Sequence, residues 1–355
     1  MLSVIGIDSS EKWDEIVKNF ENYDVYYLSD YIRAFEIHGD GKPILFYYEE
    51  EDIRAINVVM LRDISEVPGF NGKIPLNTYY DITTPYGYGG FIVDGHPTES
   101  TLVKLELEYR DYCKKNNILS EFVRFHPVLN NVNGMKYVYD NVINLGQTIT
   151  MRLESRNQIW NDLKGKNRNV IRKAQKAGVE IYWGRNPDLF EKFIEMYKAT
   201  MDKDDAENYY YFNEGFYKSI LNDLKYNSLM FYAVLEEKII AMSMILFSNQ
   251  KMHYHLSASN REYLSYAPTN LLLYEAACWG SENGFEFFHL GGGLGGKEDS
   301  LFRFKKAFNR NSNTNFAIGK KIFDKEKYGE LLNIRMKEAV FDSDANFFPA
   351  YRYKN

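Results

Sequence analysis

The feature of this 355-residue sequence that most constrains its fold is a strand–helix–strand pattern between residues 251 and 290. Residues 251–257 alternate in polarity, as the residues of a half-buried strand do. The apolar residues 271–279 are long enough for three helical turns and stop before Asn283-Gly284. Residues 285–290 form a second apolar run bounded by glycines. Because one helix joins the two strands, the pattern predicts a parallel pair and an α/β (α+β) fold.

The predicted active site follows the second of these strands. In open α/β sheets, ligands bind beyond the carboxyl ends of the strands. Here the strand ends at Gly291, and Asp299 and the pair Phe304-Lys305 come next. A lysine ammonium at this place can stabilise the oxyanion of an acyl-transfer intermediate, and a phenylalanine ring offers a flat stacking surface. The alternative for Lys305 is an ordinary surface lysine.

Three histidines occur on the two predicted strands, so their rings could approach one cleft. His253 and His255 share a face of the first strand, and His289 lies on the second. An imidazole can deprotonate an amine because its pKa lies near working pH, which makes His255 and His289 candidate general bases. Hydrogen-bonded wall residues are the alternative. No carboxylate occurs at ligand spacing, so we expect no metal site.

Gly291, Gly293 and Gly296 form a G-x-G-x-x-G pattern after a strand, which is typical of dinucleotide-binding folds. Such a fold needs further strand–helix units after the motif, and too few residues remain. We therefore interpret the glycines as a turn that lets backbone or ligand approach closely. The sequence also lacks a Walker motif and a G-x-S-x-G elbow, which argues against nucleotide triphosphatases and hydrolases.

A similar order of elements occurs twice in the chain. An aromatic lead into a helix, a strand, an acidic turn and a second strand fall within residues 26–61 and again within residues 210–246. A helix and a strand within residues 97–125 resemble those within residues 268–289. We interpret the chain as two copies of one α/β unit, with a chance similarity as the alternative.

The length of the chain also favours two domains, because a single core rarely serves more than about 250–300 residues. We expect a first domain at residues 1–150 and a second domain, with the active site, at residues 151–321. A C-terminal segment, residues 322–355, could pack back on the first domain. No low-complexity linker separates the halves, so we expect them to pack tightly.

The composition is that of a globular protein, with 45% hydrophobic and 26% charged residues. The 29 tyrosines and 24 phenylalanines favour aromatic-lined grooves. A formal charge of −6 argues against extensive coating of nucleic acid, so we expect no DNA partner. Cys113 and Cys278 lack metal-ligand spacing, which excludes structural zinc. No segment approaches 18 uninterrupted apolar residues, and we expect a cytoplasmic protein with at most peripheral membrane contact.

One basic segment stands out in this acidic sequence. Residues 163–178 hold six positive charges and no acidic residue, on a predicted helix that ends at Gly178. The six are Lys164, Lys166, Arg168, Arg172, Lys173 and Lys176. A solvated helix face is one interpretation. Phosphate contact is the other, because such charges would hold an anionic substrate or the end of an RNA.

Three features together resemble the FemABX-like branch of the GNAT acyltransferases. They are the two similar α/β halves, R-N-V-I-R-K-A-Q-K-A-G at residues 168–178, and L-F-R-F-K-K-A-F at residues 301–308. The most specific matches also include residues 197–212, 253–257 and 288–293. The resemblance implies tandem GNAT-like domains, each a mixed, mostly antiparallel sheet with a central strand–helix–strand unit and flanking helices. It also implies metal-free transfer of an aminoacyl group from aminoacyl-tRNA to an amine of a peptidoglycan precursor.

The resemblance further implies roles for single residues. Lys203 falls where the family often has arginine, Tyr254 falls where a ligand-facing tyrosine occurs, and Phe304-Lys305 fall where the donor end is expected. Basic and tyrosine side chains would grip the phosphates of the acceptor. The expected substrate-binding residues are Lys203, Tyr210, Tyr254, His253, Phe304, Asp299, Arg168 and Arg172, and the expected catalytic residues are Lys305, His255 and His289.

The sequence departs from the family pattern in three places. The helix that ends at residues 34–38 lacks a lysine that peptidoglycan enzymes often have there, and no coiled-coil insertion interrupts the second half. Residues 261–267 contain no glycine, whereas CoA-dependent GNATs close an R/Q-x-x-G-x-G/A loop on a pyrophosphate. The last difference makes aminoacyl-tRNA the preferred donor co-substrate over acyl-CoA, with no bound cofactor.

Three functions remain open from the sequence. The first is an aminoacyl-tRNA-dependent N-acyltransferase that acts on a cell-envelope precursor and contacts the acceptor end of tRNA. The second is an acyl-CoA-dependent GNAT acetyltransferase that acts on an amino sugar or a polysaccharide intermediate. The third is a non-catalytic module that binds phosphorylated glycans in the same cleft.

Overall fold

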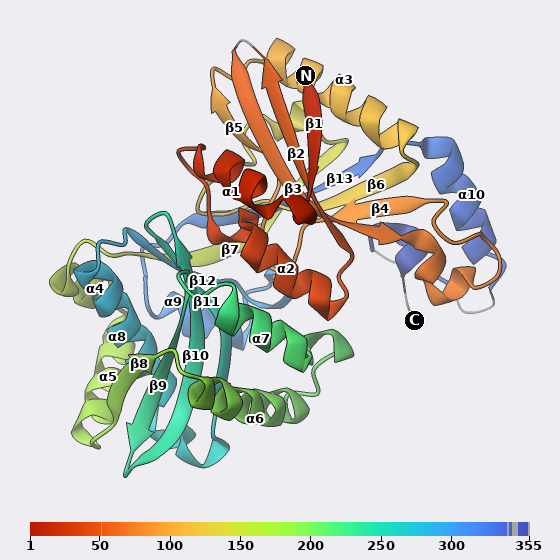
Figure 1. Cartoon of the computed structure of the whole chain (residues 1–355). Coiled ribbons are helices and arrows are strands. Elements are labelled where there is room, and N and C mark those ends of the chain that lie inside the picture. Colours follow the sequence, from red (N-terminus) through yellow and green to blue (C-terminus); the bar gives the residue numbers. More distant parts are fainter. Residues whose placement is uncertain (51, 339–340, 343–346, 354–355) are drawn as a thin grey trace. The chain divides into compact units, whose positions relative to one another are not determined.

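The structure is a computed structural model that describes residues 1–50, 52–338, 341–342 and 347–353 (Figure 1). The chain forms two compact units. Unit 1 consists of Met1–Asn144 together with Phe316–Asn355, and unit 2 consists of Leu145–Asn315. Unit 1 is therefore built from two separate segments of the chain, whereas unit 2 is built from one.

Unit 1 contains a mixed sheet with the strand order β1-β2-β3-β4-β6-β13. Neighbouring strands are antiparallel except β4 and β6, which are parallel and are joined through the helix α3. The strands are β1 (Leu2–Gly6), β2 (Lys42–Glu50), β3 (Ile53–Asp63), β4 (Tyr80–Thr83), β5 (Ile92–Gly95, paired with β3), β6 (Ile118–Arg124) and β13 (Thr314–Ile322). The helices are α1 (Ser10–Lys18), α2 (Ser29–His38), α3 (Glu99–Lys115) and α10 (Lys325–Arg335).

Unit 2 contains a second mixed sheet, with the strand order β8-β9-β10-β11-β12-β7. Here the parallel pair is β11 and β12, joined through α8, and the other neighbours are antiparallel. The strands are β7 (Asn141–Arg152), β8 (Glu180–Gly184), β9 (Ser228–Leu235), β10 (Lys238–Ser248), β11 (Lys251–Ser259) and β12 (Phe287–Gly291). The helices are α4 (Arg156–Asp162), α5 (Gly165–Lys176), α6 (Pro187–Lys203), α7 (Glu214–Asn222), α8 (Pro268–Glu282) and α9 (Ser300–Lys306).

The same order of pairings therefore occurs in both units, which confirms the expected fold of two similar α/β halves. Phe46 on β2 and Phe231 on β9 lie on corresponding strands, as the repeated sequence pattern predicts. The sheet of unit 1 is completed by a strand from the far end of the chain, because β13, which follows most of unit 2 in the sequence, pairs with β6. In unit 2 the strand beside β12 is β7, whose residues from Leu145 onward begin that unit.

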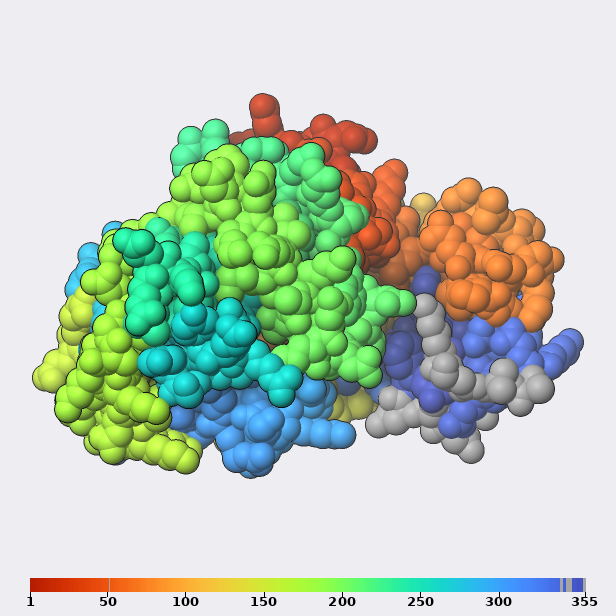
Figure 2. All heavy atoms as spheres, turned by 90° about the horizontal axis from the view of Figure 1, so that it is seen from below, coloured from red at the N-terminus to blue at the C-terminus, as the bar shows by residue number. Residues whose placement is uncertain are grey.

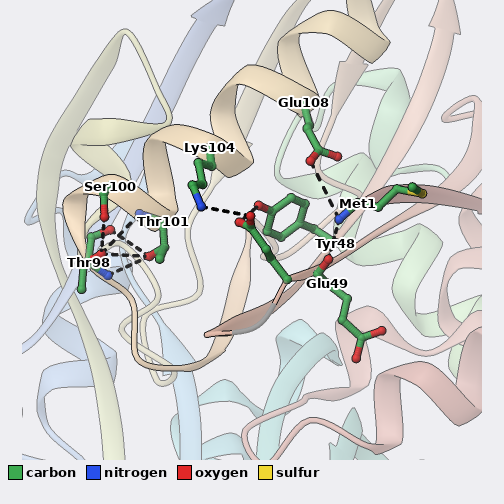
Figure 3. Close-up of polar contacts among 9 residues, drawn as sticks. Met1, Tyr48, Glu49, Thr98, Ser100, Thr101, Lys104 and Glu108 are labelled. Atoms are coloured by element: carbon green, nitrogen blue, oxygen red, sulfur yellow. Dashed lines mark hydrogen bonds and ion pairs between the residues drawn. The ribbon is translucent and has the colours of Figure 1, made fainter.

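Polar contacts tie α3 of unit 1 to the strands beside it (Figure 3). The helix begins with a capping box in which Thr98 and Thr101 bind each other's backbone amides. One turn further on, the Lys104 ammonium lies 3.0 Å from a Glu50 carboxylate oxygen at the end of β2. The Tyr48 hydroxyl donates to the same carboxylate at 2.7 Å. These contacts orient α3 against the sheet.

The sheet of unit 2 is covered on both faces (Figure 1). α8 packs on one face, with α4 and α5 against it, and α6 and α7 lie on the other. The core on the α8 side contains Met252, Leu272 and Phe288, all fully buried. Strand residues that alternate with these, such as Met244, are buried as well. Among the described residues, no helix combines the length and the apolar character needed to cross a membrane.

Candidate functional site

The two parallel strands of unit 2 separate beyond their first residues. β11 pairs with β12 only from Lys251 to His253, opposite Phe287 to His289. Beyond that point β11 follows β10 to Ser259, whereas β12 follows β7. The carboxyl ends of the two strands are therefore not joined to each other. Ligands bind beyond such strand ends in sheets of this kind.

Lys305 lies on α9, which begins beyond the end of β12. Its side chain is buried, with 8% of the residue exposed, and its ammonium donates to the Gly292 carbonyl at 2.8 Å. Burial lowers the pKa of Lys305 to about 8, against the opposing attraction of the Asp299 carboxylate. The cation predicted beside the strand ends is thus a buried lysine. The alternative interpretation of Lys305 as an ordinary surface lysine is excluded.

Asp299 shapes the turn that carries Lys305. Its carboxylate accepts from the Phe302 amide at 2.8 Å, as the N-cap of α9, and from the Leu294 amide at 2.9 Å. These backbone hydrogen bonds hold the pKa of Asp299 below its usual value. A Cβ at Gly293 would clash with the Lys297 carbonyl oxygen and with this carboxylate, which confirms the interpretation of the glycines as a close-approach turn. Asp299 was expected to bind substrate, and in the structure its carboxylate organises the turn.

Two of the predicted histidines lie together inside unit 2. The ring centroids of His253 and His289 are 6.0 Å apart, and both side chains are buried. His289 Nδ1 shares a hydrogen bond of 2.9 Å with the Thr150 hydroxyl of β7, which in turn accepts from the Thr314 hydroxyl at 3.0 Å. His289 therefore belongs to a polar network of neighbouring strands, as the alternative of a hydrogen-bonded wall residue predicts.

His255 is the extra residue of a bulge in β11, because the register with β10 shifts between Met244, opposite Leu256, and Ile245, opposite Tyr254. Burial, together with the nearby His253, lowers the pKa of His255 to about 3. The imidazole is neutral at physiological pH and its conjugate acid is strongly disfavoured. The predicted role of general base for His255 thus has no electrostatic support in this fold.

Tyr254 and Phe304 have their rings against the core of unit 2. The hydroxyl of Tyr254 interacts with those of Ser257 and Ser243, which lie 3.0 Å apart on the paired strands β11 and β10. Phe304 lies edge-to-face with Phe308, with ring centroids 5.4 Å apart. Both aromatic residues are partly exposed, so each keeps part of its surface available to a ligand.

Lys203 and Tyr210 lie in the segment between α6 and α7. Lys203 is the last residue of α6, its ammonium lies 3.2 Å from the Asp204 carboxylate, and its side chain is 44% exposed. Tyr210 ends the short 3₁₀ helix η6 (Asn208–Tyr210) and lies edge-to-face with Tyr209. The end of α6 is close to the end of β11, since the Thr200 hydroxyl accepts from the Ser259 amide at 3.4 Å. The hydrogen bond of the Lys305 ammonium is instead with the Gly292 carbonyl.

The basic segment forms α5, which begins against the end of α9. The Lys164 amide donates to the Ala307 carbonyl at 2.9 Å, and the Asn167 side chain donates to the same oxygen at 3.3 Å. Further along, the Lys173 ammonium donates to the Ser265 carbonyl at 2.9 Å, in the 3₁₀ helix η7 (Arg261–Tyr266) before α8. Figure 2 shows α5 (yellow-green), η7 (teal) and the α9 segment (blue) on one face of unit 2. Arg168 and Arg172 are on this helix, as predicted.

A buried polar network between β7 and the segment after α9 was not predicted from the sequence. Thr150 donates its amide to the Ser312 hydroxyl at 3.0 Å, and its carbonyl accepts from the Asn309 side chain at 2.7 Å. These contacts attach the segment after α9 to β7. The only sequence signal was the run of polar residues at 309–315, because the partner strand lies more than 150 positions away.

Comparisons with known proteins agree with the fold described above. Residues 162–306 match the family described as Acetyltransferase (GNAT) domain. Most of unit 2 is therefore similar to the GNAT family, and the chain is an acyltransferase. This confirms the expected enzyme class and leaves the non-catalytic glycan-binding module without support. No curated protein sequence matches the chain.

The fold of the whole chain is similar to that of FemX. The FemX crystal structure is 15% identical, covers 92% of this chain and 99% of its own, and superimposes with a TM-score of 0.66. A C-terminal domain (DUF2156) from Agrobacterium fabrum, provisionally named a lysylphosphatidylglycerol synthetase, is 11% identical, with coverages of 93% and 95% and a TM-score of 0.53. A conserved protein of unknown function from Bacteroides thetaiotaomicron is 12% identical, with coverages of 90% and 100% and a TM-score of 0.53. The FemABX-like resemblance is thus confirmed at the level of the fold.

Proposed function

We propose that this acyltransferase moves an aminoacyl group from aminoacyl-tRNA to an amine of a cell-envelope (peptidoglycan) precursor in the cytoplasm. The observation that carries the proposal is the buried Lys305, whose ammonium is held by the Gly292 carbonyl at the end of β12. A cation fixed in a desolvated position is what an acyl-transfer intermediate requires. The FemX-like fold and the resemblance to enzymes with this activity support the choice of donor and acceptor.

The reaction exchanges one bond of the acyl carbon for another. The acceptor nitrogen attacks the ester carbonyl, and the carbonyl oxygen gains negative charge in the tetrahedral intermediate. The Lys305 ammonium stabilises that oxyanion, since burial strengthens the attraction between opposite charges. The C–N bond is kept, the C–O bond to the ribose breaks, and the proton lost by the amine ends on the ribose oxygen.

His255 is a weak base in this fold, because burial lowers its pKa to about 3. His289 Nδ1 is engaged with the Thr150 hydroxyl. We therefore assign the amine proton to the ribose oxygen that leaves. The phosphates of the acceptor are assigned to Lys203 and Tyr210, in the segment after Thr200 of α6, which contacts the end of β11. Those of the donor are assigned to Arg168 and Arg172 on α5.

The proposal is tested by replacing the buried lysine. Lys305→Met should lower kcat for transfer from charged tRNA by about a hundredfold or more, the usual effect of removing one oxyanion contact. Lys297→Met, the same change at an exposed lysine of the preceding turn, is the matched control and should keep wild-type activity. Full transfer activity in Lys305→Met protein would remove the assigned role.

Acyl-CoA is the second candidate donor, and two observations favour it. The matched family is described as an acetyltransferase domain. In addition, Ala267, directly before α8, adopts a left-handed backbone with φ of 52°, so the loop reaches this conformation although it lacks glycine. Calorimetry with CoA and with charged tRNA separates the two donors, because only the true donor should bind with about micromolar affinity or better.

A further inference from the structure

Unit 2 has an open cleft whose lining residues do not include Lys305. The cleft has a volume of about 360 Å³, within the range of small-molecule sites. It lies on the outer side of α8, between α4 and α5. Its walls are formed by Arg156, Asn157, Trp160, Arg172, Gln175 and Tyr274.

Aromatic rings in a fixed arrangement form one wall of this cleft. Trp160 and Tyr274 lie edge-to-face, with ring centroids 5.3 Å apart. The Arg172 guanidinium lies over the indole of Trp160, 5.0 Å from the ring centroid. Tyr274 belongs to the buried core and Trp160 packs against it, so the indole is held in place. A held indole with a guanidinium over it forms a flat, positively charged surface on which a heterocycle can stack.

The positive charge available to a ligand comes from α5. Arg156, on α4, is already paired with Glu275 at 3.3 Å and with Glu282. Arg172 makes no ion pair within the part of the chain that the structure describes, and its guanidinium donates to the Asn169 side chain at 3.3 Å. Arg168 lies one turn earlier on the same side of α5. An anionic group is therefore attracted to the α5 side of the cleft.

Side-chain amides complete the set of groups around the cleft. Asn157 and Gln175 each offer one carbonyl acceptor and two N–H donors. The edge of a nucleobase carries donors and acceptors of the same kind. The cleft therefore combines a stacking surface for a base, amides for the edge of the base and an unneutralised guanidinium for a phosphate. These are the three kinds of contact that a nucleoside phosphate makes.

We propose that this cleft binds a nucleoside phosphate, with its base on Trp160 and its phosphate at Arg172. Which molecule carries this nucleotide rests on the proposed function, because the two candidate donors, aminoacyl-tRNA and CoA, both contain nucleotides. The start of α5 contacts the end of α9, and eight residues of helix between Lys164 and Arg172 span about 12 Å. A nucleotide in the cleft would thus anchor a donor whose acyl end reaches the Lys305 turn.

The test measures nucleotide binding by calorimetry on the full chain. The probes are adenosine 5′-monophosphate, CoA and a trinucleotide of RNA, with adenosine and inorganic phosphate as half-ligand controls. The wild-type protein should bind adenosine 5′-monophosphate at least about tenfold more tightly than either half-ligand. Tighter binding of the trinucleotide than of CoA identifies an RNA strand as the source, and the reverse order identifies CoA.

Three variants in the cleft and one control outside it locate the binding. Arg172→Gln and Trp160→Leu should each weaken binding about tenfold or more, whereas Arg172→Lys should recover part of the loss, since it keeps the charge but not the planar stack. Arg152→Gln, the same change at a 69% exposed arginine outside the cleft, should bind like the wild type. Circular dichroism on each variant excludes loss of folding. Equal binding by wild type, Arg172→Gln and Trp160→Leu would overturn the proposal.

Failure of this inference can be told from failure of the proposed function. If the protein transfers acyl groups but no probe binds below about 1 mM, the cleft inference is wrong and the proposed function stands. If nucleotides bind in an Arg172-dependent way but no acyl group is transferred, the proposed function fails and the cleft stands. Binding to vesicles of anionic lipid without binding of nucleotides would reassign the basic face to a membrane and overturn the cleft inference.

Discussion

At the scale of single residues, Lys305 sets the expected pH dependence of transfer. A lysine is charged below its pKa, and the pKa of Lys305 is about 8. If the ammonium stabilises the oxyanion, kcat should fall as pH rises through about 8. Lys305→Arg, if active, should lose this alkaline limb because arginine stays charged. Initial rates measured from pH 6 to pH 9.5 check this, and activity that rises across pH 8 would indicate a neutral amine acting as base instead.

The same lysine should limit the stability of unit 2. Its pKa is about 8 in the folded protein against 10.5 when unperturbed, and this difference corresponds to roughly 3 kcal/mol of unfavourable free energy while both states are protonated. The penalty fades between pH 8 and 10.5, where the unfolded chain binds more protons. Lys305→Met should therefore raise the free energy of unfolding at pH 7 by about 2 kcal/mol, after the loss of one hydrogen bond.

Urea unfolding at pH 7 and at pH 10 measures this effect, and the gain should be smaller at pH 10. Lys297→Met, at an exposed position, should change the free energy of unfolding by less than about 0.5 kcal/mol. A Lys305→Met protein that is less stable than the wild type at pH 7 would show that the lysine is a structural contact. Stabilisation combined with loss of activity is the signature of a group retained for function.

At the scale of secondary structure elements, the turn between β12 and α9 depends on Gly293. A side chain there would clash with the Lys297 carbonyl and the Asp299 carboxylate, so Gly293→Ala must displace one of them. We expect kcat to fall about tenfold or more, because the displaced turn no longer holds Gly292 against Lys305. Gly329→Ala in α10, where nothing lies within 4 Å of the added methyl, is the matched control and should keep activity. Wild-type kinetics in Gly293→Ala protein would contradict the role of the turn.

The elements around the site could be predicted from the sequence because their signals are local. The alternation at residues 251–257, the bounded apolar run of α8 and the basic run of α5 are read from residues within one turn or one strand. The bulge at His255 could not be predicted in this way, since it arises from pairing with β10. The strict alternation that put His253 and His255 on one face is interrupted by the single extra residue in the pairing.

At the scale of the whole molecule, the C-terminal residues complete unit 1. The fully buried Asp81 carboxylate is contacted by Arg62 at 2.7 Å, by Arg352 and by the Tyr351 hydroxyl at 3.0 Å. Burial opposes its charge, but Arg62 and Arg352 together hold the pKa of Asp81 below its usual value. Such a carboxylate stabilises the fold at neutral pH, and this stabilisation is lost as pH falls through the folded-state pKa.

Arg352→Gln should therefore destabilise unit 1 by about 3 kcal/mol at pH 7 and raise the pH at which acid unfolding begins. Thermal and acid unfolding followed by circular dichroism measure both effects. Lys18→Gln, which breaks a surface pair with Asp14, should cost less than about 0.5 kcal/mol and leave the acid transition in place. Identical acid transitions for the wild type and Arg352→Gln would show that Asp81 does not depend on the C-terminal residues.

The sequence by itself determined the two α/β halves, the strand–helix–strand unit with its glycine turn, and the positions of Lys305 and the basic helix. These follow from local periodicity and from residue types with few conformational options. Only the tertiary structure decided which strands complete each sheet, that Lys305 is buried, that His255 is a poor base, and that Trp160 meets Arg172. The reason is physical: burial, pKa and stacking depend on neighbours that are distant in the chain, and no local pattern contains them.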